Sequence, residues 1–78
     1  IAHKQDDFVE AERLWREDLA ISREIGNRIG ESSSLINLGS IMNSKGLYDE
    51  KHRMYTEAVR IQREYGITID QWFIDNGY

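Results

Sequence analysis

The sequence predicts an all-α protein of antiparallel helix hairpins that stack on one another as repeats. Residues 6–26 and residues 46–66 repeat each other at an offset of forty residues, and a fixed period of roughly 20–50 residues is typical of stacked repeat proteins. Apolar residues in both stretches recur at helical spacing. Proline is absent, so nothing interrupts a long helix from within.

The internal repeat depends on seven identical and four similar positions. The identical pairs are Glu10/Glu50, Arg13/Arg53, Glu17/Glu57, Ile21/Ile61, Arg23/Arg63, Glu24/Glu64 and Gly26/Gly66. The similar pairs are Phe8/Tyr48, Leu14/Met54, Trp15/Tyr55 and Leu19/Val59. Because stacked repeats present extended surfaces to other molecules, this pattern indicates a binding function and no catalysis.

Composition excludes several other classes of protein. The 78 residues carry a net charge of −4, which argues against a nucleic-acid partner because such an interface needs a basic face. Cysteine is absent, so disulfide and zinc–thiolate frameworks are excluded. The apolar runs are too short to span a bilayer, so we expect no membrane partner. The chain starts with isoleucine, and we expect an excised fragment of a cytoplasmic protein.

The first predicted helix covers residues 7–25. Asp7 and Glu10 form a capping-box pattern at its start, and Gly26 is expected to end it in a left-handed conformation. Its apolar stripe consists of Phe8, Ala11, Trp15, Leu19 and Ser22. A flank beside the stripe consists of Leu14, Ile21 and Ile25. An apolar surface of this breadth indicates contact with two neighbouring helices.

The second predicted helix covers residues 28–45, with Asn27 as its N-cap. Residues 32–44 contain no charged side chain, although 31% of the chain is charged. One face carries Leu35, Leu38, Gly39 and Met42, and the opposite face carries Ser33, Asn37, Ser40 and Ser44. A glycine in mid-helix costs about 1 kcal/mol relative to alanine. We therefore expect another helix to approach closely at Gly39.

A third helix is predicted over residues 47–65 and a short fourth helix over residues 67–76. The stripe of the third helix is Tyr48, Tyr55 and Val59, flanked by Met54, Ile61 and Tyr65. In the fourth helix, Thr68 and Gln71 form a capping-box pattern, and Ile67 and Trp72 are placed as a hydrophobic staple. We expect Trp15, Trp72 and Phe73 to belong to the core and the cap.

The second and third helices resemble the tetratricopeptide repeat in its longer variety of about forty residues. The matching residues are Leu35, Asn37-Leu38-Gly39, Met42, Gly46, Tyr48, Tyr55 and Ala58. The resemblance implies a right-handed superhelix, that is, an α-solenoid fragment. Residues 1–26 would form a partial repeat in which residues 1–5 end an earlier helix. Residues 28–66 would form a complete repeat, and residues 67–78 a C-terminal capping segment.

The resemblance also implies a concave groove that binds a peptide or protein segment. Its lining would be Ser33, Ile36, Asn37, Ser40, Asn43 and Ser44. Family members use the asparagine at the position of Asn37 to hold the backbone of a ligand. The basic clamp that some members use for a carboxylate is absent from this helix. An alternative is that these polar residues pack against a missing repeat or have no binding role.

Two further roles stay open. The chain could be the structural C-terminal cap of a longer array, which would self-associate through its exposed N-terminal end as a homo-oligomer. It could also be a regulatory helical domain of a larger multidomain protein. We expect no catalytic residue, no cofactor and no metal site, because His3 and His52 are far apart and no His/Asp/Glu set has ligand spacing. Two residues depart from the family pattern, Lys51 and Asp18. We expect Lys51 to lie at the end of the array with its head in water, or else to mark a looser hairpin crossing. Asp18 could pair with a nearby arginine or lie at an exposed edge, and the sequence does not decide between these.

Overall fold

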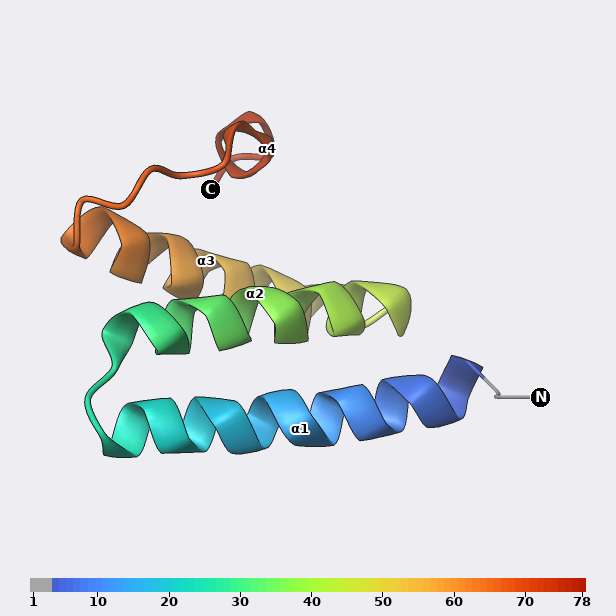
Figure 1. Ribbon diagram of the computed structural model, residues 1–78. Helices are drawn as coiled ribbons and strands as arrows, with labels where there is room; N and C mark the ends of the chain where they lie inside the picture. Colours follow the sequence, from blue (N-terminus) through green and yellow to red (C-terminus); the bar gives the residue numbers. More distant parts are fainter. Residues whose placement is uncertain (1–3) are drawn as a thin grey trace.

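The computed structural model describes residues 4–78, with side chains from residue 8 onward. Its four helices are α1 (Lys4–Glu24), α2 (Arg28–Ser44), α3 (Tyr48–Glu64) and α4 (Gln71–Asp75). Figure 1 shows that α1 and α2 run antiparallel, that α3 returns behind α2, and that α4 lies beyond α3 at the top of the view. α2 contacts both α1 and α3. The described residues contain no strand, and the predicted all-α architecture is confirmed.

Local capping signals define the C-terminal end of α1 and both ends of α2 as predicted. The Oδ1 atom of Asn27 accepts a hydrogen bond of 2.9 Å from the backbone N–H of Gly30, which caps α2. α1 and α2 are each followed by a glycine in the left-handed region, with φ of 73° at Gly26 and 76° at Gly46. A side chain is strained in that conformation, so glycine ends both helices.

The predicted start of the first helix is wrong. α1 already includes Lys4, so Asp7 lies inside the helix and does not cap it. Residues 4 and 5 belong to the same helix as residues 7–24 and do not end an earlier one. The physical reason is that residues 4–7 contain no glycine or proline that would stop a helix.

The predicted start of the fourth helix is also wrong. Asp70 is the N-cap of α4, and its Oδ1 atom accepts a 2.8 Å hydrogen bond from the N–H of Trp72. Thr68 lies three residues before the first residue of α4, so it is not the N-cap, and Ile67 and Trp72 do not occupy the staple positions of this helix. A carboxylate two residues before the recipient N–H satisfies one of the free donors of the first turn. The predicted end of the segment is confirmed, because Asn76 is the C-cap.

The three long helices share one apolar cluster. It consists of Leu19 from α1, Leu35 and Leu38 from α2, and Ala58 and Ile61 from α3. Leu19 belongs to the predicted stripe of α1, and Leu35 and Leu38 belong to the predicted apolar face of α2. Their removal from water is the main stabilising contribution that a domain of this size can gain.

The apolar face of α3 differs from the prediction at two positions. Ile61, predicted as a flank residue, is 0% exposed, whereas Tyr48, predicted in the stripe, is 62% exposed. Tyr48 is the first residue of α3, and its ring lies 5.1 Å from the ammonium group of Lys51. At that end of the helix a ring can pack on a lysine and stay in contact with water.

The close approach predicted at Gly39 is present, and its partner is Tyr55. A Cβ atom added to Gly39 would lie 2.5 Å from Cε1 of the Tyr55 ring. The hydroxyl groups of Tyr55 and Ser40 are 2.9 Å apart, which is a hydrogen-bond distance. Tyr55 is only 6% exposed. The absence of a side chain at Gly39 therefore allows α3 to pack directly on the backbone of α2.

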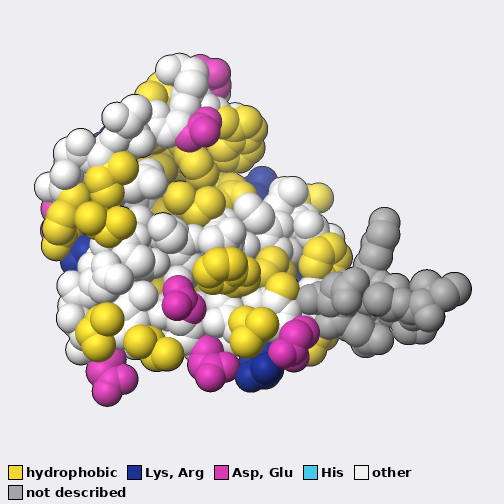
Figure 2. All heavy atoms as spheres, viewed as in Figure 1, with side chains coloured by type: hydrophobic (Ala, Val, Ile, Leu, Met, Phe, Trp, Pro, Cys, Tyr) yellow, Lys and Arg dark blue, Asp and Glu magenta, His cyan; other side chains and the backbone are white. Residues whose placement is uncertain are grey.

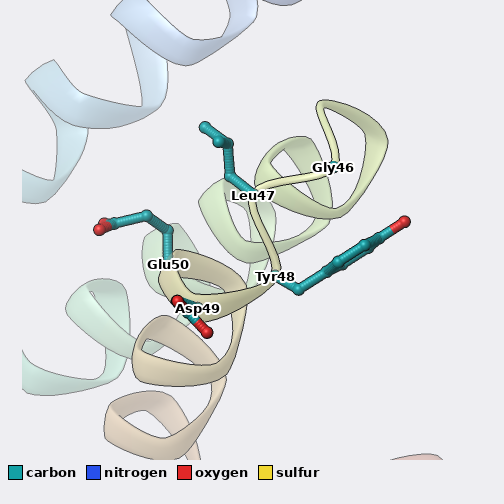
Figure 3. Close-up of a pocket in the computed structure, with 5 residues that line it drawn as sticks. All are labelled: Gly46, Leu47, Tyr48, Asp49 and Glu50. Carbon is teal, nitrogen blue, oxygen red and sulfur yellow. The ribbon is translucent and has the colours of Figure 1, made fainter.

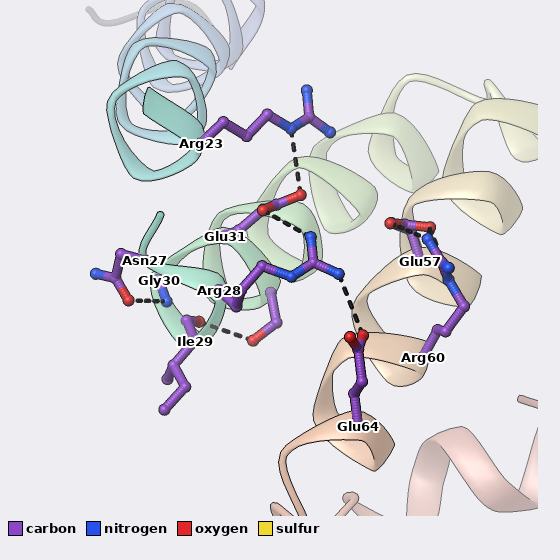
Figure 4. Close-up of polar contacts among 10 residues, drawn as sticks. Arg23, Asn27, Arg28, Ile29, Gly30, Glu31, Glu57, Arg60 and Glu64 are labelled. Atoms are coloured by element: carbon purple, nitrogen blue, oxygen red, sulfur yellow. Dashed lines mark hydrogen bonds and ion pairs between the residues drawn. The ribbon is translucent and has the colours of Figure 1, made fainter. Parts of the chain in front are cut away.

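A chain of ion pairs joins the three long helices near the α1–α2 turn (Figure 4). Glu31 of α2 is 5% exposed and accepts from Arg23 of α1 at 3.3 Å and from Arg28 at 3.0 Å. Arg28 also reaches Glu64 of α3 at 3.2 Å. Hydrogen bonds to Glu64 and Glu31 raise the pKa of Arg28 above its ordinary value. The chain links all three helices through one buried carboxylate.

We predict that Gly39→Ala destabilises the protein although alanine is the better helix former. The added methyl group would lie 2.5 Å from the buried Tyr55 ring, which would have to shift, and overpacking of a core costs about 1–3 kcal/mol. We expect a net loss of up to about 2 kcal/mol after the gain of about 1 kcal/mol in helix propensity. Urea unfolding followed by circular dichroism measures it.

The matched control is Ala20→Gly at an exposed position of α1. This variant should lose about 1 kcal/mol, which shows the ordinary preference for alanine. A Gly39→Ala protein more stable than the original would contradict the proposed packing of Tyr55.

We predict that Glu31→Gln lowers the free energy of unfolding by about 1–2 kcal/mol. Removing one partner of a fully buried ion pair costs about 3–5 kcal/mol, but Arg23 and Arg28 are partly exposed and Arg28 keeps Glu64. The control is Glu17→Gln, whose pair with Arg13 is exposed on both sides, and it should cost less than about 0.5 kcal/mol. Equal effects of the two variants would argue against a structural role for Glu31.

Candidate functional site

The six predicted groove residues all lie on α2, on the side away from Leu35, Leu38 and Met42. We call this set the groove face. Four of its side chains are exposed and two, Ile36 and Asn37, are half-buried. In Figure 2 the acidic and basic groups in view lie mostly along α1 and beside α4, and few lie on α2 between them. The groove face consists of Ser33, Ile36, Asn37, Ser40, Asn43 and Ser44.

The serines of the groove face bond to their own helix. The hydroxyl groups of Ser33 and Ser40 donate to the carbonyl oxygens of Ile29 and Ile36 at 3.3 and 3.1 Å. Ser44 donates to the carbonyl oxygen of Ser40 at 3.3 Å. A serine that donates in this way keeps its oxygen lone pairs as acceptors. These hydroxyl groups can therefore accept hydrogen bonds from a ligand without breaking existing ones.

Asn37 occupies the centre of the groove face with its amide held in place. One amide N–H donates to the carbonyl oxygen of Ser33 at 2.9 Å. No hydrogen bond between described residues uses the amide oxygen or the second N–H. Because Asn37 is half-buried, its amide can present one acceptor and one donor in a defined orientation. That combination matches the donor and acceptor of a peptide backbone.

Asn43 and Lys51 form a contact between α2 and α3. The ammonium group of Lys51 donates to the amide oxygen of Asn43 at 3.2 Å. The head of Lys51 thus leaves the helix crossing while its half-buried stem packs there. The contact explains how a lysine is tolerated at a position where the family pattern favours a small residue.

Asp18 has a structural partner in the next helix. Its carboxylate accepts a 2.5 Å hydrogen bond from the hydroxyl of Ser34, and Ser34 is fully buried. A buried hydroxyl without a partner is costly, so the carboxylate stabilises the α1–α2 packing. Neither Asp18 nor Lys51 belongs to the groove face.

A surface hollow of about 310 Å³ adjoins the groove face where α2 meets α4. Two groove-face residues, Ile36 and Ser40, line one side. The hollow is lined by Ile36, Ser40, Tyr55, Asp70, Trp72 and Phe73. We call it the α2–α4 hollow. It contains apolar and aromatic surface, the hydroxyl groups of Ser40 and Tyr55, and one carboxylate.

The aromatic residues of the α2–α4 hollow hold one another edge to face. The ring of Tyr55 lies 5.1 Å from that of Phe73 and 5.7 Å from that of Trp72, at interplanar angles of 84° and 80°. Phe73 is buried as predicted, whereas Trp72 is 48% exposed. The prediction that Trp72 belongs to the core is therefore only half right. The sequence analysis did not identify Asp70 as the N-cap of α4 or as a residue of the hollow. Aspartate is a favoured N-cap residue, and its position directly before Gln71, the first residue of α4, could have indicated the cap.

The two histidines take part in no metal cluster that the structure describes. His3 lies outside the described residues. The Nδ1 atom of His52 lies 3.2 Å from the hydroxyl of Tyr78. Burial raises the pKa of the Tyr78 phenol above its ordinary value, with a smaller effect of Tyr55. Among the side chains that the structure describes, from residue 8 onward, no group of three His, Asp or Glu is placed to hold a metal ion.

A second hollow, of about 390 Å³, lies at the α2–α3 turn and is lined by residues 46–50. Figure 3 shows that Leu47, Tyr48 and Glu50 point in different directions from the turn. Ligand sites place a few polar groups so that they converge on one volume. The groups around this hollow diverge, so it is not a candidate site. None of the helices in residues 4–78 combines the length and apolarity needed to cross a membrane.

Residues 32–66 match the family model described as tetratricopeptide repeat. The matched segment contains the groove face, the Gly39–Tyr55 contact and the whole of α3. No curated protein and no solved structure matches the chain significantly. Repeats of this family are generally non-catalytic modules for protein–protein interaction. The chain therefore carries a tetratricopeptide repeat at residues 32–66, within an all-α arrangement of stacked helices.

Proposed function

We propose that the groove face of α2 binds an extended segment of a partner protein. The observation that carries the proposal is the amide of Asn37, which is half-buried, fixed by Ser33 and equipped with one free donor and one free acceptor. An extended peptide offers the complementary backbone N–H and C=O groups at regular intervals. Asn37 would hold one of these peptide units.

The lack of charge on the groove face supports recognition of the peptide backbone. Arg28, the cation in the first turn of α2, is engaged by Glu31 and Glu64. Lys45, directly after α2, pairs with Glu12 at 2.8 Å. Serine and asparagine can meet a ligand without the desolvation cost of a charged group. The groove face itself carries no cation, and Lys51 of α3 reaches it at Asn43.

We predict that Asn37→Ala weakens peptide binding about two- to tenfold, the value of one net hydrogen bond. Peptides selected on the protein from a random display library serve as ligands, and dissociation constants are measured by fluorescence anisotropy. The loss arises because the alanine side chain has neither the amide oxygen nor the amide N–H.

The control variant is Thr56→Ala, an exposed polar position on α3 outside the groove face. It should leave the dissociation constants unchanged. Peptides that bind Asn37→Ala and the original protein equally would show that the groove face does not bind them.

A second candidate function is a structural cap that self-associates through α1. The internal repeat provides a specific observation in its favour. Ile21 is 52% exposed, whereas Ile61, its equivalent forty residues later, is 0% exposed because α2 covers it. Leu14 is exposed to the same extent as Ile21. The flank of α1 therefore has the composition of a helix–helix interface but lacks a covering helix among the described residues.

We predict that the apparent mass of the protein in static light scattering rises with concentration and that Ile21→Glu abolishes this rise. A charge on the flank would be costly to bury between two copies. Ile74→Glu, at a half-exposed isoleucine of α4, is the matched control and should behave as the original. A monomer at all concentrations would eliminate the self-association proposal.

A further inference from the structure

We propose that the α2–α4 hollow takes the side chain of an arginine from the bound polypeptide segment. This inference rests on the proposed function, because the hollow is an extension of the groove face. Ile36 and Ser40 belong to both. A peptide held at Asn37, one residue from Ile36, can direct a neighbouring side chain into the hollow. The volume of about 310 Å³ suits one long side chain and is small for a folded partner.

The aromatic side of the hollow fits a flat cation. Trp72 is about half exposed. Its ring makes edge-to-face contacts with Tyr55 and Phe73 and lies 6.4 Å from the ring of Tyr78 at an interplanar angle of 17°. An indole is the aromatic group on which a guanidinium group stacks most favourably. Figure 2 shows hydrophobic side chains beneath α4 with acidic groups next to them. The ring is thus both accessible and fixed in position.

The charge of the hollow also favours a cation. Asp70 uses Oδ1 as the cap of α4 and takes part in none of the ion pairs between described side chains. The other carboxylate of this segment, Asp75, accepts from the amide of Gln71 at 2.9 Å and lies outside the hollow. No lysine or arginine lines the hollow. The whole chain, with a net charge of −4, is complementary to a basic partner.

Arginine fits this combination better than the other cationic side chains. Its planar guanidinium group can stack on Trp72 and at the same time donate to the carboxylate of Asp70. A lysine ammonium has no plane to stack, and a trimethylated ammonium has no N–H to donate. The hydroxyl of Ser40 can accept one further guanidinium N–H at the edge of the hollow.

The test compares two short peptides that differ only in charge. One is acetyl-Gly-Ser-Arg-Ser-Gly-amide, and the other contains citrulline, the neutral isostere of arginine, in the same place. Binding to the 78-residue protein is followed by ¹H–¹⁵N NMR, with the indole N–H of Trp72 assigned through the Trp15→Phe variant. We expect the arginine peptide to shift the Trp72 signal and to bind about two- to fivefold more tightly than the citrulline peptide, as for a partly exposed ion pair.

Two variants identify the carboxylate responsible. Asp70→Asn removes the charge but keeps the cap of α4, because asparagine caps a helix as well as aspartate does. It should bind the two peptides equally. Asp75→Asn removes a carboxylate of the same helix that lies outside the hollow, and it should keep the preference for arginine. Higher salt should reduce this preference in the original protein.

Several outcomes would overturn the inference. These are equal binding of both peptides to the original protein, an unchanged preference in Asp70→Asn, no binding, and a shift of Trp15 in place of Trp72. A lysine peptide that binds as tightly as the arginine peptide would show a general cation site and would also overturn it. If both peptides shift the side-chain amide of Asn37 but not the Trp72 signal, the groove is retained and the arginine site is rejected. Failure of the groove itself is decided separately by the Asn37→Ala variant and the selected peptides.

Discussion

The contact of the Tyr55 ring with the backbone of Gly39 is the constraint on which the remaining structure depends. It determines how closely α3 approaches α2, because the ring occupies the space that a Cβ atom would fill. The same ring supports Phe73 and Trp72 through edge-to-face contacts, and its hydroxyl group contacts Ser40. The position of α4 and the floor of the α2–α4 hollow therefore both depend on one tyrosine and the missing side chain of one glycine.

The features that could be predicted from sequence are those with a local physical cause. Asn27 and Gly46 act on backbone groups within a few residues, so their spacing alone defines the ends of α2. The close approach at Gly39 could be predicted because a glycine in mid-helix lowers helix stability and therefore indicates a compensating contact with another helix. The groove face is predicted from the absence of charged side chains over residues 32–44 of α2, and four of its six side chains are exposed in the structure, whereas Ile36 also packs against the core. Its binding role and the division into repeats stay predictions.

The features that could not be predicted depend on neighbours distant in the sequence. Ile61 is predicted on the flank of α3 and Tyr48 in its stripe, yet Ile61 is buried against residues of α1 and α2 whereas Tyr48 is exposed at the first residue of α3. Thr68 and Asp70 are both acceptable N-caps, and the choice between them depends on how Phe73 reaches Tyr55. The two sides of the α2–α4 hollow are thirty residues or more apart, so Asp70 and Trp72 could not be assigned to the surface near Ser40.

The buried Glu31 has a consequence for how adjacent helices recognise each other. An arginine at the end of α1 pairs with a glutamate eight residues later, in the first turn of α2. The repeat places Arg63 at the end of α3, but the residue eight positions later is Gln71, whose amide donates to Asp75 within α4. The α1–α2 junction thus has an ion pair between its helices, and the equivalent positions of the α3–α4 junction do not form one. Both junctions follow helices of similar sequence, yet added salt should weaken the packing at the α1–α2 junction more than the packing of α4 on α3.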